Sequence, residues 1–496
     1  MTQRWQSVGR WALFSGMALG LFVLAWLVGH VVRSRGTQIE RGPQAPWSSA
    51  EPASLAVLPD EAARAGIRLV PAPEPHALMF VHPDSPCWVE VPRPDAFPDY
   101  ATAVRARRAG QFGGLKSASA PAEAQAGQRG RAVSEPDAGA GFLGAQACTP
   151  CHRERYERYR QTAHFLTSAR ADTSTVLGPL EDGNNMMHTG HPDLKFRMLG
   201  DGAGRVVQEV TFRELRKRVP MDIVTGAGVV GQTYLFWQGH ALYQDHVSYF
   251  TRTGSWINSP GYQDGTAWYA RKVIPKCLEC HATYVATVDR DVPVYDPATL
   301  ILGISCERCH GPGAEHVAYH EQHPDAPARH VVNPSDLTAE QQNDVCAQCH
   351  FGSATPIGQP FSFRPGDDAD AFWQLPPGVE SLAGGVHSSN QLARLQLSAC
   401  FVGSPAMTCS DCHDPHENQR GDLGGFSQRC QACHQPEHCG MFERIGLDIA
   451  TNCIDCHMPR REDDKIAVHQ PAGIEFPMLR DHFIRVVPEL SERLAP

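Results

Sequence analysis

Cysteine pairs separated by two residues, each followed at once by a histidine, recur along the sequence. This C-x-x-C-H pattern occurs seven times and uses 14 of the 17 cysteines. Histidine is only about one residue in twenty, so its presence after all seven pairs has odds on the order of one in a billion by chance. The histidine is therefore part of the motif. The copies are Cys148-Cys151-His152, Cys277-Cys280-His281, Cys306-Cys309-His310, Cys346-Cys349-His350, Cys409-Cys412-His413, Cys430-Cys433-His434 and Cys453-Cys456-His457.

The chemistry that needs two thiols and an adjacent imidazole is the covalent attachment of haem c. The thiols add to the two vinyl groups as thioethers, and the histidine becomes the proximal ligand of the iron. Zinc sites also use paired cysteines, but they do not need a histidine directly after the second one. A disulfide framework leaves the histidines unexplained, and thioredoxin-like chemistry uses a single C-x-x-C on an α/β unit. We therefore predict seven covalently attached haems c.

Each iron needs a second axial ligand or keeps an open site. Fourteen histidines outside the motifs follow His152, twice the number required. His164 ends an amphipathic stretch that predicts a helix running back over a haem face. His316 follows Gly311 and Gly313, which let the backbone turn tightly beside a porphyrin. His416 lies three residues beyond His413, so we expect it to ligate a neighbouring haem.

Three further histidines, His188, His387 and His482, are additional candidates for distal ligands. His240, His438 and His469 compete for the seventh place, which the sequence does not assign. About half of the fourteen histidines must have another role, because a lone histidine is often a surface or core residue.

Several strings resemble the cytochrome c552/c554-type multihaem cytochromes, from about residue 144 to residue 488. They include "CHRERYERYRQTAHF", "YLFWQGHALYQDHVSYF", "SWINSPGY", "SCERCHGPGAEHV" and "CIDCHMP" followed by "DHF". The resemblance implies a mostly helical, loop-rich shell around a ladder of haems, in an exported electron-transfer protein. It also implies that the distal ligands are His164, His188, His316, His387, His416 and His482.

Related enzymes of the same superfamily suggest an alternative, catalytic role. Pentahaem nitrite reductases carry a catalytic C-x-x-C-K motif, which this sequence lacks. Hydroxylamine oxidoreductases use a tyrosine cross-linked to a haem, and the aromatic stretch before Cys277 offers candidates, although such a stretch more often packs around a porphyrin. The candidate tyrosines are Tyr234, Tyr243, Tyr249, Tyr262 and Tyr269.

Few residues are available to form the elements that position each motif. Seven haems after Cys148 leave about 50 residues for each, so we expect the porphyrins to supply much of the buried apolar surface. The 39 prolines and 44 glycines favour a loop-rich fold. We predict a mainly α fold with much irregular structure, organised around a packed haem array. A net charge of -10 argues against nucleic acid as a partner.

The N-terminal region differs from the rest. Residues 11–32 are almost wholly apolar and are flanked by arginines, which predicts an uncleaved membrane anchor over residues 1–35; the alternative is a signal that is cleaved on export. Residues 36–141 are rich in Ala, Pro and Gly and predict a tether with a small folded patch. The heptahaem domain is expected over residues 142–496.

These observations predict a periplasmic electron carrier held at the inner membrane. Its partners would be redox donor and acceptor proteins or a quinol-linked complex. The alternative is an oxidoreductase in which one five-coordinate haem acts on a small nitrogen or sulfur compound, because such a site needs only an open iron face and a nearby acid or base.

Overall fold

The computed structural model describes residues 68–72, 77–81, 88–93, 95–111, 141–352, 354–374, 385–463 and 466–494. The chain divides into two compact units, Met1–Ala45 and Pro46–Pro496, and every described residue lies in the second unit. The predicted anchor at residues 11–32 lies outside the described residues. Within the described ranges, no helix has both the length and the apolar character needed to cross a membrane.

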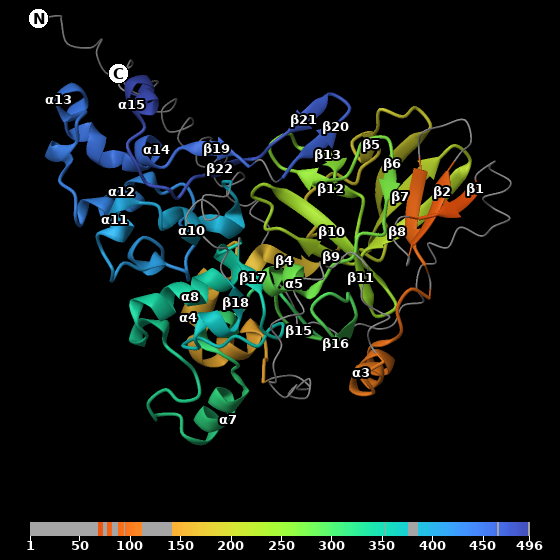
Figure 1. Cartoon of the computed structure of the whole chain (residues 1–496), viewed down its shortest axis with the longest axis horizontal. Helices are drawn as coiled ribbons and strands as arrows, with labels where there is room; N and C mark the ends of the chain where they lie inside the picture. The colour runs from red at the N-terminus through yellow and green to blue at the C-terminus, as the bar shows by residue number, and fades with distance from the viewer. Residues whose placement is uncertain are drawn as a thin grey trace, which may run out of the picture. The chain divides into compact units, whose positions relative to one another are not determined.

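Strands dominate residues 168–302, where the only helix is α5 (Pro275–His281). Two sheets fill most of this segment (Figure 1). The first is a four-stranded antiparallel meander of β5 (Met186–His188), β6 (Leu194–Gly200), β7 (Val206–Phe212) and β8 (Leu215–Met221). The second has the order β13 (Ser255–Asn258), β12 (Val247–Phe250), β10 (Gly231–Gln238), β9 (Ile223–Thr225) and β4 (Ser168–Arg170), with β11 (Ala241–Gln244) also paired to β10.

The prediction of a mainly α fold is therefore wrong, because strands as well as helices make up much of the described chain. Along β6, Leu194, Phe196 and Met198 are buried, while Lys195 and Arg197 between them are exposed. This period of two is the pattern of a strand with one face on a core. The aromatic string that follows forms the hairpin of β10 and β11, which turns at Gly239 with a φ of 60°. Apolar packing between sheets, rather than haem contact, explains why these residues are aromatic.

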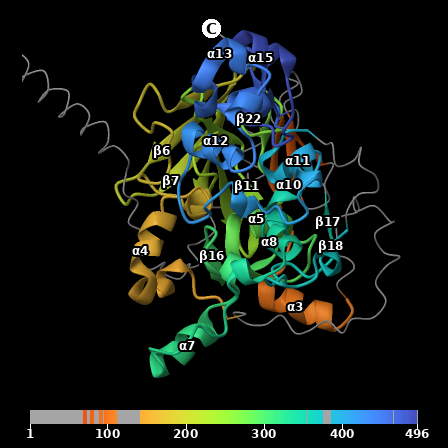
Figure 2. The same ribbon diagram turned by 90° about the vertical axis from the view of Figure 1, so that its left-hand side faces the viewer.

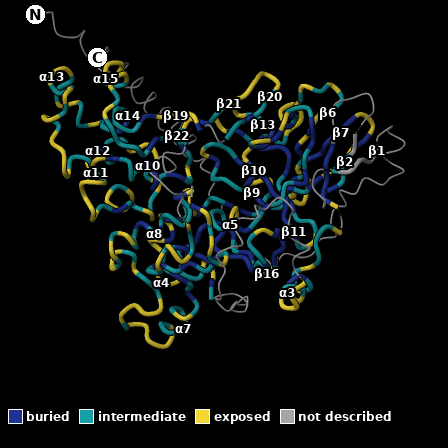
Figure 3. Tube along the Cα trace, viewed as in Figure 1, coloured by how far each residue is buried: buried dark blue, intermediate teal, exposed yellow. Residues whose placement is uncertain are grey.

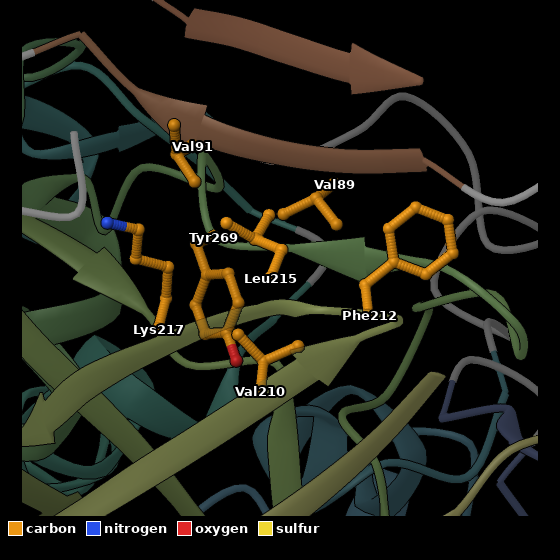
Figure 4. Close-up of a pocket in the computed structure, with 7 residues that line it drawn as sticks. All are labelled: Val89, Val91, Val210, Phe212, Leu215, Lys217 and Tyr269. Carbon is orange, nitrogen blue, oxygen red and sulfur yellow. The ribbon is translucent and has the colours of Figure 1, made fainter. Parts of the chain in front are cut away.

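A third sheet joins the N-terminal part of the described chain to this core. It has the order β1 (Arg68–Pro71), β2 (Ala77–Val81), β3 (Trp88–Pro92) and β14 (Ala267–Trp268), and β14 runs parallel to β3. Figure 4 shows where β3 covers β7 and β8. The space left between them is a cavity of about 10 Å³, too small for more than one water molecule, lined by Val89, Val91, Val210, Phe212, Leu215, Lys217 and Tyr269.

The seven motifs lie on short helices or begin or end within a few residues of one. Besides α5, these are η3 (Ala145–Cys148) with α4 (Thr149–Tyr159), α6 (Glu307–His310), α8 (Ala339–His350), η8 (Cys409–Asp411), α12 (Leu423–Gln431) and α14 (Cys453–His457). Between α5 and α6 the chain forms an antiparallel hairpin of β15 (Ala282–Thr287) and β16 (Tyr295–Leu302). Helices α5 and α8, which are far apart in sequence, lie side by side (Figure 2).

Burial differs sharply between the sheets and the C-terminal helices (Figure 3). The sheets have an ordinary apolar core, in which Phe196, Phe236 and Tyr269 are at most 1% exposed. In contrast, only Thr408 and Ser427 are buried among residues 401–450. A segment of this length cannot be stabilised by so little buried protein surface. The helices of this segment therefore need further apolar groups to pack against.

Candidate haem centre

One helical turn places the two thiols of a motif on the same side as its histidine. The backbone N–H of His310 donates to the carbonyl of Cys306 at 3.0 Å, and His413 does the same to Cys409 at 3.0 Å. The N–H of His434 donates to the carbonyl of Cys430 at 2.9 Å. Residues three apart on a helix are neighbours on its surface. Each motif therefore presents two thiols and an imidazole together, as attachment to one flat group requires.

Four motif histidines face a second imidazole that comes from a distant part of the chain. The centroid distances are 6.4 Å for His152 and His316, 6.0 Å for His164 and His350, 6.1 Å for His310 and His416, and 6.2 Å for His413 and His482. Metal–imidazole nitrogen bonds of about 2 Å each bring two ring centroids to about 6 Å, since each centroid lies about 1 Å behind its nitrogen. The four separations fit one iron between each pair.

Hydrogen bonds fix the orientation of several of these rings. Nδ1 of His310 lies 2.8 Å from the carbonyl oxygen of Val332. Nδ1 of His350 lies 2.7 Å from the carbonyl oxygen of Ser388, and Nδ1 of His316 lies 2.7 Å from the carbonyl oxygen of Arg329. A carbonyl oxygen only accepts, so each Nδ1 carries the proton and donates. The lone pair is then left on Nε2, which is the usual arrangement for a metal-binding histidine.

The protonation state of the rings also suits a metal. Burial lowers the pKa of His164 and of His482 to about 4. Burial likewise lowers the pKa of His310, His350 and His413. A neutral imidazole binds a metal, whereas a protonated one cannot. At neutral pH these rings therefore need no proton to be removed before they ligate.

Thiols of different motifs lie next to one another. Three pairs of side chains are within hydrogen-bonding contact: Cys148 with Cys306, Cys280 with Cys349, and Cys346 with Cys409. Each contact joins two motifs at their attachment points. Groups attached there would be close neighbours, because almost no protein separates the sulfur atoms.

A cavity of about 2380 Å³ adjoins the motif helices. Pockets for ordinary small ligands measure about 300–1,000 Å³. The lining includes cysteines and the histidine of six motifs, all except the one that contains His281. Among the described residues, no cluster of three or more His, Cys, Asp or Glu side chains is arranged to hold a bare metal ion. The arrangement suits several large groups with paired ligands, which is what haems require.

Comparison with known proteins gives the same answer. Residues 245–311 match the family described as cytochrome c554 and c-prime, and this span contains the motifs of Cys277 and Cys306. The chain is a multihaem c-type cytochrome. It is 27% identical over 187 residues to the multiheme cytochrome MtrA of Shewanella baltica. The aligned residues cover 34% of this cytochrome and 54% of MtrA.

Two other proteins are similar. The C-type polyheme cytochrome OmcC of Geobacter sulfurreducens is 25% identical over 183 residues, which cover 35% of this cytochrome and 22% of OmcC. The cytochrome thus spans about half the length of MtrA and about a fifth of OmcC. The crystal structure of the outer cell wall cytochrome OcwA aligns over 72% of this chain and 82% of its own, with a TM-score of 0.42 and 16% identity.

Two predicted distal ligands, His188 and His387, do not face a motif histidine within the described residues. His188 lies on the exposed end of β5, where no other imidazole faces it within the described residues. His387 accepts the backbone N–H of Ser389 at Nδ1 (3.0 Å), and its Nε2 lies 3.7 Å from the buried carboxylate of Asp463. Within the part of the chain that the structure describes, His281, His434 and His457 have no facing imidazole at about 6 Å.

Two positions that support the motifs gave no signal in the sequence. Glu307 is only 4% exposed and accepts hydrogen bonds from three backbone N–H groups, those of Leu143, Gly144 and Gly313. Asp481 is fully buried and is paired with Arg394. A glutamate inside a motif and an aspartate before a histidine are common residue types, and only the distant partners reveal their roles.

Proposed function

We propose that this cytochrome binds seven haems c, one at each C-x-x-C-H motif, and relays electrons among them. The observation that carries the proposal is the set of four imidazole pairs at 6.0–6.4 Å, each of which contains one motif histidine. When bound, haem iron supplies one-electron redox chemistry. The chain holds each haem through two cysteines and positions it with the rings on either side.

The proposed axial pairs are His152 with His316, His350 with His164, His310 with His416, and His413 with His482. All four supply a distal imidazole from a part of the chain far from the motif, and each pair therefore also fastens two segments together. His188 and His387 remain predictions as distal ligands of the other three haems, whose proximal ligands are His281, His434 and His457. A proximal and a distal imidazole together close both faces of an iron, which favours electron transfer over binding of an external ligand.

The contacts between thiols suggest which haems are neighbours. The contact of Cys148 with Cys306 pairs the first and third motifs, and that of Cys280 with Cys349 pairs the second and fourth. The contact of Cys346 with Cys409 extends the second pair to the fifth motif. The contacts thus give two groups of neighbouring haems, the first with the third and the second with the fourth and fifth, and electrons pass directly within each group.

A second candidate function is catalysis at one open haem. The observation that favours it is the motif around His281, which lies outside the large cavity and faces no imidazole within the described residues. The Nδ1 atom of His281 lies 3.0 Å from the hydroxyl oxygen of Thr167, so the ring is oriented like a proximal ligand even without a partner. The substrate in this case would be a small nitrogen or sulfur compound.

The proposed location is the periplasm, with residues 11–32 as an inner-membrane anchor or, alternatively, as an export signal that is removed. Haem attachment through thioethers needs reduced thiols, and all sixteen cysteines of the described residues are free of disulfides. The proposed partners are redox donor and acceptor proteins or a quinol-linked complex. If residues 11–32 remain as an anchor, membranes from cells that make the full chain should retain the cytochrome after a high-salt wash.

Low-temperature electron paramagnetic resonance of the oxidised protein tests both functions. The electron-carrier proposal expects low-spin ferric signals from at least the four paired haems. A high-spin ferric signal from one haem, which shifts when a small ligand such as cyanide is added, supports the catalytic candidate. A spectrum with only high-spin signals contradicts the four proposed axial pairs.

A further inference from the structure

A buried ion pair is formed by the residue that directly precedes His482. Asp481 is fully buried, and its two carboxylate oxygens accept hydrogen bonds from Nε (2.9 Å) and Nη2 (2.8 Å) of Arg394. The side chain of Arg394 is only 7% exposed. Two parallel N–H···O bonds fix both the distance and the angle between a guanidinium and a carboxylate. The next residue, His482, faces His413 at 6.2 Å.

The carboxylate also orders the backbone that carries His482. Oδ1 of Asp481 accepts the backbone N–H of Phe483 at 3.0 Å, and its own N–H donates to the carbonyl of Pro459 at 2.9 Å. The guanidinium groups of Arg394 and Arg485 lie over the ring of Phe483, 5.5 and 4.6 Å from its centroid. Residues on both sides of His482 are therefore held in place.

The opposite end of the ion pair is part of a rigid element. Arg394 lies on α10 (Gln391–Leu395), which packs against α8, the helix of the fourth motif. Shortly after α10, the hydroxyl of Ser398 accepts the N–H of Ile484 at 2.8 Å and donates to the carbonyl of His482 at 3.3 Å. The segment around His482 thus takes its position from α10 through two independent contacts.

Other cations near Asp481 are less suited to this role. Arg485 contacts one oxygen at 3.1 Å and is 27% exposed, and Arg461 lies 3.7 Å away and is 54% exposed. Each makes a single contact, and exposed ion pairs contribute little. Removing Arg394 would leave a buried carboxylate without its main partner, which is strongly unfavourable. The segment would then move to hydrate that carboxylate.

We propose that Arg394 and Asp481 are a positioning pair that holds His482 as the second axial ligand of the haem at Cys409, Cys412 and His413. This inference rests on the proposed function, since it takes the facing rings of His413 and His482 as an axial pair. Arg394 does not contact the iron site itself. Its role is to fix the backbone on which the ligand is carried.

The test compares three variants of the full-length oxidised holoprotein by electron paramagnetic resonance, with the haem number checked by mass. His482→Ala gives the reference, with one low-spin haem lost. Arg394→Met should lose the same signal while all haems stay attached, and millimolar imidazole should restore it. Arg213→Met is the matched control, because Arg213 forms an exposed ion pair with Asp193 at 3.0 Å and should leave the spectrum unchanged.

The outcomes separate the two proposals. If His482→Ala leaves every low-spin signal in place, the axial assignment in the proposed function fails. If His482→Ala loses a signal but Arg394→Met does not, the positioning role is overturned. Should Arg394→Met not fold, Arg394→Lys replaces it: lysine keeps the charge but not the two-pronged geometry. The same imidazole-reversible loss is expected there, and an unchanged spectrum would overturn the proposal.

Discussion

Replacing Glu307 with glutamine should destabilise the cytochrome although the two side chains have nearly the same shape. Oε1 of Glu307 accepts the backbone N–H groups of Leu143 (2.8 Å) and Gly313 (2.9 Å). Oε2 accepts the N–H of Gly144 at 2.7 Å and the hydroxyl of Ser305 at 3.1 Å. One buried carboxylate therefore ties the chain before the first motif to the turn after the third.

The expected loss follows from the donors that glutamine cannot satisfy. Its Oε1 can keep two acceptor bonds, but its amide group would point N–H donors at the N–H of Gly144. The hydroxyl of Ser305 can reorient and accept, but the charge-assisted bond from the N–H of Gly144 is lost and leaves that buried N–H without an acceptor. The two bonds to Oε1 are weakened, because that oxygen no longer carries charge. Hydrogen bonds to charged groups contribute about 1.5–3 kcal/mol each. We expect a loss of about 3 kcal/mol, roughly a hundredfold in the folding equilibrium.

Denaturant unfolding of the purified holoprotein, followed by circular dichroism, measures this loss. Glu214→Gln is the control, because Glu214 is exposed on the turn between β7 and β8 and should change the free energy of unfolding by less than about 0.5 kcal/mol. If Glu307→Gln unfolds at the same denaturant concentration as this control, the network around Glu307 does not stabilise the fold as argued.

The remaining predictions concern the haem ligands and one buried acid. His416→Ala should remove one low-spin signal without changing the haem number, because His416 faces His310 at 6.1 Å; an unchanged spectrum would count against that pair. The double variant Cys277→Ala/Cys280→Ala should lower the mass of the denatured protein by one haem, and a loss of none would show that this motif is not an attachment site. Burial raises the pKa of Asp222 to about 6, so the folded protein binds this proton more tightly than the unfolded chain and stability falls as pH rises from about 4 to about 6. Asp222→Asn should therefore raise the free energy of unfolding more at pH 7 than at pH 4, by about 2–3 kcal/mol. Thermal melts at the two pH values measure this difference, and an equal effect at both would exclude the raised pKa.

The attachment motifs could be read from the sequence because their chemistry is local. Three residues within one helical turn carry the whole requirement, so the spacing of Cys306, Cys309 and His310 is sufficient without a fold. The opposing ligands are different. His164 faces His350 and His152 faces His316 across long stretches of chain, and neither local spacing nor composition specifies such a partner.

The sheets were missed for another reason. The alternation of Leu194, Phe196 and Met198 with charged residues was present in the sequence and predicts a strand. The resemblance to haem-packed helical proteins and the small number of residues per haem favoured a helical prediction instead. Residues 168–302 instead build an ordinary apolar core of their own, while residues 401–450 have almost none. The estimate of about 50 residues per haem therefore averages two very different regions.

Intact mass spectrometry of the denatured full-length chain measures whether each of the seven C-x-x-C-H motifs carries a covalently bound haem. Thioether bonds survive denaturation, whereas haem held only by axial histidines is released. We expect the polypeptide mass plus seven haems, with reduced thiols remaining only at the three cysteines outside the motifs. A mass with fewer than seven haems, or free thiols at a motif, would contradict it.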